Sequence, residues 1–241
     1  MLNETFLFKG KRANSMGIEL QESIIISNPY PKFTQHVIPG RNGSVYEYDG
    51  TYEDRQIYAS CYLLSHLLER DVDAINSWLI SDPGYYRFED TKDPTHFMMA
   101  VAKNGIEKHA RNEILNTFSL EFSAKPQRFL KIGEKQISIP ESGATIKNPT
   151  KYTSFPLIEF NGVGNFEISI AGKKLTIKEI TSPIFYDAEA DSAYRGNMSL
   201  DSKVGSSDRI ALPPGEIPIS ISTPDKSTFL YMRITPRWWE L

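Results

Sequence analysis

Short stretches in which apolar and polar residues alternate dominate this chain, and they predict β-strands rather than helices. In its first half these stretches are rich in β-branched and aromatic side chains, the composition of half-buried strands. They occupy residues 5–9, 34–38, 44–48, 56–62, 85–89, 96–101 and 113–124. Lys125-Pro126 is expected to end the last of them, because proline has no backbone N–H to donate to a sheet.

One segment, residues 67–81, has a helical period instead. Its apolar side chains fall three and four positions apart and so share one face of an α-helix. The residues on that face are Leu68, Val72, Ile75, Trp78 and Leu79. Asp82-Pro83-Gly84 ends the segment, because proline disfavours helical geometry in the residue before it. We expect this amphipathic helix to cover one face of a sheet.

A β-hairpin is predicted over residues 36–50. Pro39-Gly40-Arg41-Asn42-Gly43 separates two alternating stretches, and Asn-Gly supplies the positive φ values that a tight hairpin turn requires. Both strands are polar on one face, so we expect the hairpin to project rather than lie in the core.

The amino-acid composition of the chain changes at residue 131. Residues 131–153 are poor in aromatic side chains and contain Gly133, Pro140, Gly143 and Pro149, which favours a linker or short covering segment. Beyond them the predicted strands are short and frequent, at residues 157–160, 165–170, 174–177, 184–187, 193–195, 217–223 and 228–235. Turns such as Asn161-Gly162 separate them. This spacing predicts a β-sandwich or jelly roll over residues 154–241, after a first domain over residues 1–130.

Composition excludes several classes of protein. The chain has 241 residues and a net charge of −3, which argues against nucleic acid or an anionic membrane as its main partner. No apolar run approaches the length of a membrane-spanning helix, and the first residues lack the apolar core of a signal peptide. Cys61 is the single cysteine, so no disulfide framework exists and folding in a reducing compartment is expected.

No catalytic centre is visible in the sequence. The four histidines, His36, His66, His96 and His109, have no spacing that would place two of them on one metal ion. Asp187, Glu189 and Asp191 alternate and could offer oxygens to a hard cation, but a solvated strand end and turn is favoured. The second domain shows no convergent polar set. We therefore predict no enzymatic activity, no cofactor and no metal.

An ordered set of motifs resembles the siphophage distal tail protein (Dit) family over nearly the whole chain, although no single motif is specific. In the first half the set comprises Phe8-Lys9-Gly10, Met16-Gly17-Ile18, Ile38-Pro39-Gly40-Arg41-Asn42-Gly43, Ile75-Asn76-Ser77-Trp78-Leu79, Gly84-Tyr85-Tyr86 and Phe118-Ser119-Leu120-Glu121-Phe122. In the second half it comprises Asn148-Pro149, Phe155-Pro156-Leu157-Ile158, Ile184-Phe185-Tyr186-Asp187, Leu212-Pro213-Pro214-Gly215-Glu216-Ile217 and Ile234-Thr235-Pro236-Arg237-Trp238-Trp239.

The resemblance implies a structural role at the tip of a long non-contractile phage tail. Such proteins form homohexameric rings whose N-terminal β-sandwich domains, each with a helix and a projecting hairpin, surround a channel through which DNA passes. Their C-terminal domains are galectin-like or jelly-roll sandwiches. The implied partners are further copies of the chain, the major tail tube protein, the tail-associated lysin or tip protein, and receptor-binding or baseplate proteins. Assembly in the host cytoplasm would agree with the lone thiol.

Two other functions stay open. A carbohydrate-binding module that aids adsorption to the host wall would draw on Tyr194, Trp238 or Trp239. A hydrolase acting on wall polymer is the least favoured hypothesis.

For the ring interface, we predict the hairpin and the helix. The candidate residues are Val37, Ile38, Arg41, Val45, Tyr46, Tyr48, Leu68 and Val72. On this reading, replacing Val37 and Val45 by aspartate should give folded monomers.

Overall fold

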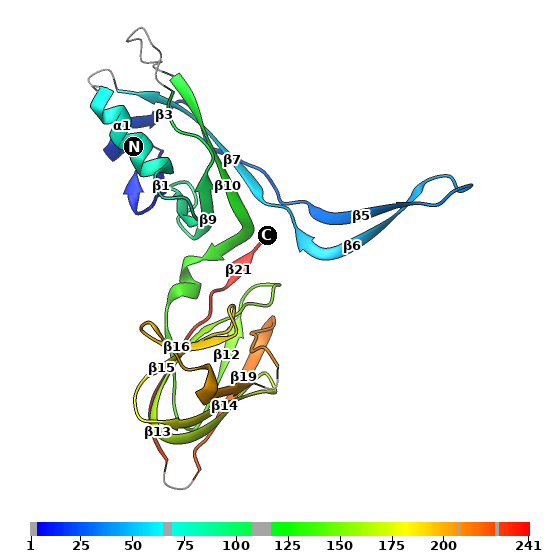
Figure 1. Cartoon of the computed structure of the whole chain (residues 1–241), viewed down its shortest axis with the longest axis vertical. Coiled ribbons are helices and arrows are strands. Elements are labelled where there is room, and N and C mark those ends of the chain that lie inside the picture. Colours follow the sequence, from blue (N-terminus) through cyan, green and yellow to red (C-terminus); the bar gives the residue numbers. More distant parts are fainter. Residues whose placement is uncertain (1–3, 65–68, 108–116, 207, 225–226) are drawn as a thin grey trace. The chain divides into compact units, whose positions relative to one another are not determined.

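The computed structural model describes residues 4–64, 69–107, 117–206, 208–224 and 227–241, and the chain forms two compact units. Unit 1 holds Met1–Arg128 together with Leu241, and unit 2 holds Phe129–Glu240. Both consist mostly of strands, with one α-helix among the described residues (Figure 1). The expectation of a mainly β protein with one notable helix is confirmed.

Unit 1 is built around one antiparallel sheet and a separate hairpin. Its elements are β1 (Phe6–Phe8), β2 (Lys11–Arg12), the 3-10 turn η1 (Asn14–Met16), β3 (Ile18–Leu20), β4 (Ile25–Ile26), β5 (Pro31–Val37), β6 (Ser44–Tyr52), β7 (Arg55–Leu63), α1 (Glu69–Ile80), β8 (Tyr86–Asp90), β9 (His96–Ala102) and β10 (Thr117–Leu130). The sheet runs in the order β2-β1-β8-β9-β10-β7-β3, with β4 also paired to β7. Among the described residues, strands β5 and β6 pair only with each other.

Helix α1 buries the face that the sequence pattern indicates. Val72, Ile75, Trp78 and Leu79 all lie in the core of unit 1. The Trp78 indole N–H donates to the Phe8 carbonyl at 3.0 Å, which satisfies the polar atom of a large buried ring. The helix therefore covers the sheet as expected. Leu68, predicted on the same face, lies outside the described residues.

Strand β10 does not end at Lys125-Pro126 but continues to Leu130. Its ladder with β7 ends at the pair Ala124 and Arg55, so Pro126 lies beyond the point where a backbone N–H would be needed. The Pro126 carbonyl instead accepts a hydrogen bond from Arg55 Nε at 2.9 Å. A proline in this position is compatible with an extended strand.

Unit 2 contains two sheets that share one long strand. Its elements are η2 (Lys131–Glu134), β11 (Ile137–Ile139), β12 (Ala144–Asn148), β13 (Leu157–Ile170), β14 (Lys173–Ile180), β15 (Ile184–Asp187), β16 (Ser192–Arg195), β17 (Met198–Ser199), η3 (Asp201–Lys203), β18 (Val204–Ser206), β19 (Gly215–Ser222), β20 (Thr228–Thr235) and β21 (Trp239–Glu240). One sheet has the order β11-β20-β13-β15-β16-β17. In the other, β12 pairs β19, β19 pairs β13, and β14 joins β13 to β18.

Strand β13 corrects the prediction of two strands separated by an Asn161-Gly162 turn. The chain continues through this dipeptide, and the pairing with β20 shifts register between Asn161 and Gly162. A side chain at Gly162 would meet the Phe166 ring at 2.7 Å, so glycine serves here for close approach at an irregular point of the strand. The first half of β13 pairs with β15 and the second half with β14, which places the strand in both sheets.

Residues 131–153, expected to be a linker or covering segment, contribute strands to unit 2. Strand β11 pairs with β20, and β12 pairs with β19. Ile139 and Ile146 are buried in the unit 2 core. Apolar side chains are sparse here because each strand is short and only its alternate residues face inward. Among the described residues, no helix is long and apolar enough to cross a membrane.

The turn between β8 and β9 is held by Asp93. Its carboxylate accepts hydrogen bonds from the Thr95 N–H at 3.2 Å and the Thr95 hydroxyl at 2.7 Å, and His96 Nδ1 lies 2.9 Å from Oδ2. Burial by itself raises the pKa of Asp93, but the hydrogen bonds from His96 and Thr95 outweigh it and lower the pKa to about 2.

Asp93→Asn is expected to lower the melting temperature at neutral pH and to matter less as the pH falls. Because the folded-state pKa lies below the ordinary value of 3.8, the carboxylate stabilises the fold above that value. This contribution is lost as the pH falls through about 2. Thermal denaturation of both proteins across this range measures the effect. A melting-temperature difference that persists unchanged to the acid end would contradict it.

Candidate functional site

The hairpin of β5 and β6 is exposed along nearly its whole length. The two strands leave the rest of unit 1 as a separate ribbon (Figure 1). Almost every residue between Lys32 and Gly50 is exposed, although several of them are large and apolar. An isolated two-stranded hairpin is only marginally stable in water, so an element of this kind is typical of a surface that is covered in an assembly.

The register of the two strands separates the hairpin into two different faces. Phe33 lies opposite Tyr48, Gln35 opposite Tyr46, and Val37 opposite Ser44. Directly opposed residues point to the same side, and alternate residues of a strand share a side. Phe33, Val37, Tyr46 and Tyr48 therefore lie on one side, which we call the aromatic face.

The aromatic face is ordered by ring contacts yet open to solvent. The Phe33 ring centroid lies 5.8 Å from that of Tyr48 and 6.2 Å from that of Tyr46. The exposed fractions are 75% for Val37, 62% for Tyr46, 54% for Phe33 and 45% for Tyr48. Rigid aromatic side chains in such a group are the residues that anchor protein interfaces.

The opposite, polar face carries Thr34, His36, Val45 and Glu47. His36 Nε2 lies 3.1 Å from Glu47 Oε2 across the two strands, with both side chains exposed. Val45 is the apolar exception and lies opposite His36. Val37 and Val45 thus point to different sides of the ribbon, so a pair of substitutions at these positions would not test one surface.

The tip of the hairpin is a six-residue loop rather than a two-residue Asn-Gly turn, because β5 ends at Val37 and β6 begins at Ser44. The Arg41 N–H donates to the Ile38 carbonyl at 3.2 Å. Pro39 and Gly40, with φ of +77° at Gly40, occupy the centre of that turn. Ile38 and Arg41 are both exposed.

The predicted interface residues include both exposed and buried positions. The six hairpin positions are exposed, and Tyr46 and Tyr48 share the aromatic face with Val37. Val72 is only 1% exposed and packs in the core of unit 1, so it is no part of a surface. Phe33 was missed, although the alternation of Phe33, Gln35 and Val37 extends the predicted strand toward it and could have revealed it.

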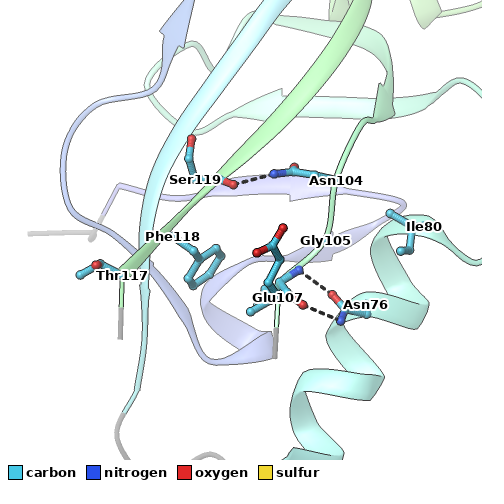
Figure 2. A pocket seen from close by; sticks show the side chains of 9 residues that line it. Asn76, Ile80, Asn104, Gly105, Glu107, Thr117, Phe118 and Ser119 are labelled. Atoms are coloured by element: carbon cyan, nitrogen blue, oxygen red, sulfur yellow. Dashed lines mark hydrogen bonds between the residues drawn. The ribbon is translucent and has the colours of Figure 1, made fainter. Parts of the chain in front are cut away.

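A cavity of about 430 Å³ lies beside α1, lined by residues of α1, the start of β10 and the segment after β9 (Figure 2). Two of its polar side chains, Asn76 and Asn104, are already engaged within the protein. Asn76 Nδ2 donates to the Ile106 carbonyl at 2.9 Å, and Asn76 Oδ1 accepts from the Ile106 N–H at 2.7 Å. Asn104 bridges Ser119 and Glu121 in the same manner. These amides hold the wall together and are not free to orient a ligand.

Asn76→Ala is expected to destabilise unit 1 by about 1–3 kcal/mol, because it leaves the donor and the acceptor of buried Ile106 without partners. Asn104→Ala is the matched control, since it also removes an amide bridge, but one to the exposed residues Ser119 and Glu121, where water can replace the bonds. Urea denaturation measures both free energies of unfolding. Equal losses for the two variants would contradict the role of burial.

Other candidate chemical groups have structural roles. Cys61 is buried, and burial raises the pKa of its thiol to about 12, so it is not a nucleophile. Asp187 pairs with Arg237 through two bonds of 2.7 and 2.9 Å, and Asp191 accepts from the Tyr186 hydroxyl at 2.5 Å. The favoured reading of a strand end and turn agrees with this arrangement. Within the described ranges, no three His, Cys, Asp or Glu residues form a group that could hold a metal ion.

The two tryptophans near the end of the chain differ in exposure. Trp238 is 3% exposed and belongs to the core of unit 2. Trp239 is half-buried, stacks on Tyr152 with a centroid distance of 4.5 Å, and donates to the Thr153 carbonyl at 3.0 Å. Trp238 is therefore removed from the set of possible sugar-stacking residues.

The fold of this chain thus comprises two β-rich units and an exposed hairpin. No family model and no curated protein sequence matches the chain. Among solved structures, it is similar to the Dit protein (gp 19.1) of phage SPP1, described as a paradigm of the hub adsorption apparatus in phages that infect Gram-positive bacteria. The TM-score is 0.72, the sequence identity is 14%, and the match covers 99% of each chain.

This similarity establishes the fold over the full length of the chain. The resemblance to distal tail proteins noted in the sequence is confirmed at that level. At 14% identity the side chains of a site are not carried over, so the hairpin has to be judged on its own residues.

Proposed function

We propose that this chain is the structural hub of a long non-contractile phage tail tip. In this proposal, six copies form a ring that surrounds the channel for DNA and joins the tail tube to the tip or baseplate. The partners are the major tail tube protein, the tail-associated lysin or tip protein, and receptor-binding or baseplate proteins. The protein acts by binding other proteins and not as an enzyme, and it is assembled in the host cytoplasm.

The aromatic face of the hairpin carries this proposal. Four apolar or aromatic side chains on an element with no core of its own would be a liability in a monomer, but they suit a contact between copies. If the hairpin contacts a different surface on its neighbour, the interface is head-to-tail. Head-to-tail contacts close into rings when the rotation between copies allows it.

The charge of the chain supports the passage of DNA without tight binding. Affinity for the phosphate backbone comes mainly from lysine and arginine, and 27 basic residues here are outnumbered by 30 acidic ones. A weakly acidic ring therefore offers no general attraction that would hold DNA in the channel.

Negative-stain electron microscopy of the purified chain tests the proposal. The expected particles are rings with six-fold symmetry and a central opening. Pull-down with the tail tube protein and the tip protein from the same gene cluster should retain both. Separate small particles at high protein concentration, together with no retention of either partner, would contradict the proposal.

A further inference from the structure

A row of four side chains crosses the outer face of one sheet of unit 2, perpendicular to the strands. Arg233 of β20 lies opposite Glu159 of β13, Glu159 opposite Phe185 of β15, and Phe185 opposite Tyr194 of β16. Opposed residues point to the same side, so all four share one face. Three strand spacings give the row a length of roughly 14 Å. We call it the outer row.

The polar end of the outer row is preorganised. The Tyr231 hydroxyl donates to Glu159 Oε1 at 2.8 Å, and Arg233 Nη1 lies 3.4 Å from Oε2. The Arg233 guanidinium also lies 4.5 Å from the centre of the Tyr231 ring. These contacts bring a carboxylate, a guanidinium and a phenol together. They form the convergent polar set that the sequence of this domain did not reveal.

Hydrogen-bonding capacity remains at both ends. The contacts of Arg233 use Nη1, and its Nε and Nη2 groups have no protein acceptor within the described parts of the chain. The Tyr194 hydroxyl likewise has no hydrogen-bond partner among the described residues. Arg233 keeps 43% of its side chain exposed, so its unused donors can reach a ligand.

The other end of the outer row is an aromatic surface. The Phe185 and Tyr194 rings are stacked, with centroids 5.7 Å apart and planes at 18°, and both are half-buried. Aromatic faces beside a few fixed polar groups are typical of ligand sites, in which the apolar surface gives contact and the polar groups give orientation.

We propose that the outer row binds a neutral saccharide. Sugar hydroxyls both donate and accept, which matches a carboxylate acceptor next to guanidinium donors, and the C–H face of a sugar ring packs on an aromatic ring. The charges of Glu159 and Arg233 offset each other, which disfavours a strongly charged ligand. Aromatic and arginine side chains also occur in protein interfaces, so capture of a tail protein is one of the outcomes that the test distinguishes.

The proposal does not depend on ring formation, since its residues belong to unit 2 and the hairpin to unit 1. The two can be tested separately. Loss of sugar binding should leave the number of subunits unchanged, and disruption of the hairpin should leave sugar binding unchanged.

The test is a neutral glycan array probed with the full chain, followed by titration with the best saccharide. We expect binding that weakens about tenfold or more in Tyr194→Ala and in Arg233→Ala, an order of magnitude in keeping with the loss of one well-placed contact. Glu159→Gln should weaken binding less, because it keeps an acceptor. Tyr152→Ala is the control, since it removes one ring of an aromatic stack outside the row.

Circular dichroism and melting temperature show that each variant is folded. The proposal is overturned if the folded wild-type chain binds no glycan on the array. It is also overturned if the row variants bind as tightly as Tyr152→Ala, or if the row variants lose capture of a tail protein while glycan binding stays the same.

Discussion

Phe33→Asp combined with Tyr46→Asp is expected to convert the assembled protein into folded monomers. The two rings lie side by side on the aromatic face, 6.2 Å apart, and both are more than half exposed. A carboxylate at each position would be desolvated without a partner if the same face were buried between copies, which is costly. In a monomer the same carboxylates would remain in water, so the fold should be unaffected.

The matched control lies on the same hairpin. Thr34→Asp combined with Val45→Asp places two carboxylates on the polar face at a similar distance from the tip. If the aromatic face is the interface, the control should assemble like wild type, as measured by light scattering after gel filtration. Equal loss of assembly in both variants would show only that the hairpin as a whole matters and not its aromatic face.

Phe122→Ala is expected to have the largest effect on stability, with a loss of about 3–5 kcal/mol. The Phe122 ring is fully buried at the centre of unit 1, with ring centroids 5.0 Å from Phe88, 5.1 Å from Phe8 and 5.6 Å from Phe6. Removing it leaves a cavity among rings that come from two other strands, β1 and β8, and cannot easily close it.

Phe122→Leu is the matched variant and should cost clearly less, because it refills most of the volume. Chemical denaturation gives the free energies, and amide spectra of unit 2 provide an internal reference, because its core shares no residue with that of unit 1. A loss below about 1 kcal/mol for Phe122→Ala would mean that this aromatic cluster is not the main support of unit 1.

Local periodicity accounts for most of the elements predicted from the sequence. Helix α1 has its apolar residues at helical spacing and ends before Asp82-Pro83-Gly84, so its position follows from the sequence alone. The strand predicted over residues 184–187 coincides with β15, and that over residues 228–235 with β20, because each has alternating burial and turn residues at its ends.

Tertiary context decided the elements that were misplaced. Asn161-Gly162 is a strong turn signal, yet β13 continues through it. The part of the strand before this dipeptide pairs in one sheet and most of the part after it pairs in the other. Pro126 is tolerated in β10 because the ladder with β7 has already ended. Both depend on which strands are neighbours, and a single sequence contains no such information.

The candidate sites also depend on strand pairing, which the sequence alone does not contain. The hairpin could be predicted because its turn residues and alternating strands are adjacent in sequence, but its two faces required the register. Val72 belongs to the core side of α1, which the helical pattern itself indicates, so its inclusion in an interface was avoidable. The outer row joins Glu159, Phe185, Tyr194 and Arg233 across 74 positions of the chain between Glu159 and Arg233, and only strand pairing brings them together.

Native mass spectrometry of the full chain, measured beside the Phe33→Asp/Tyr46→Asp variant, tests the central proposal most directly. We expect a wild-type mass of six subunits, each of 27.4 kDa, and a single-subunit mass for the variant with an unchanged melting temperature. A wild-type chain that remains a single subunit at high concentration, or a variant that still forms the six-subunit species, would contradict it.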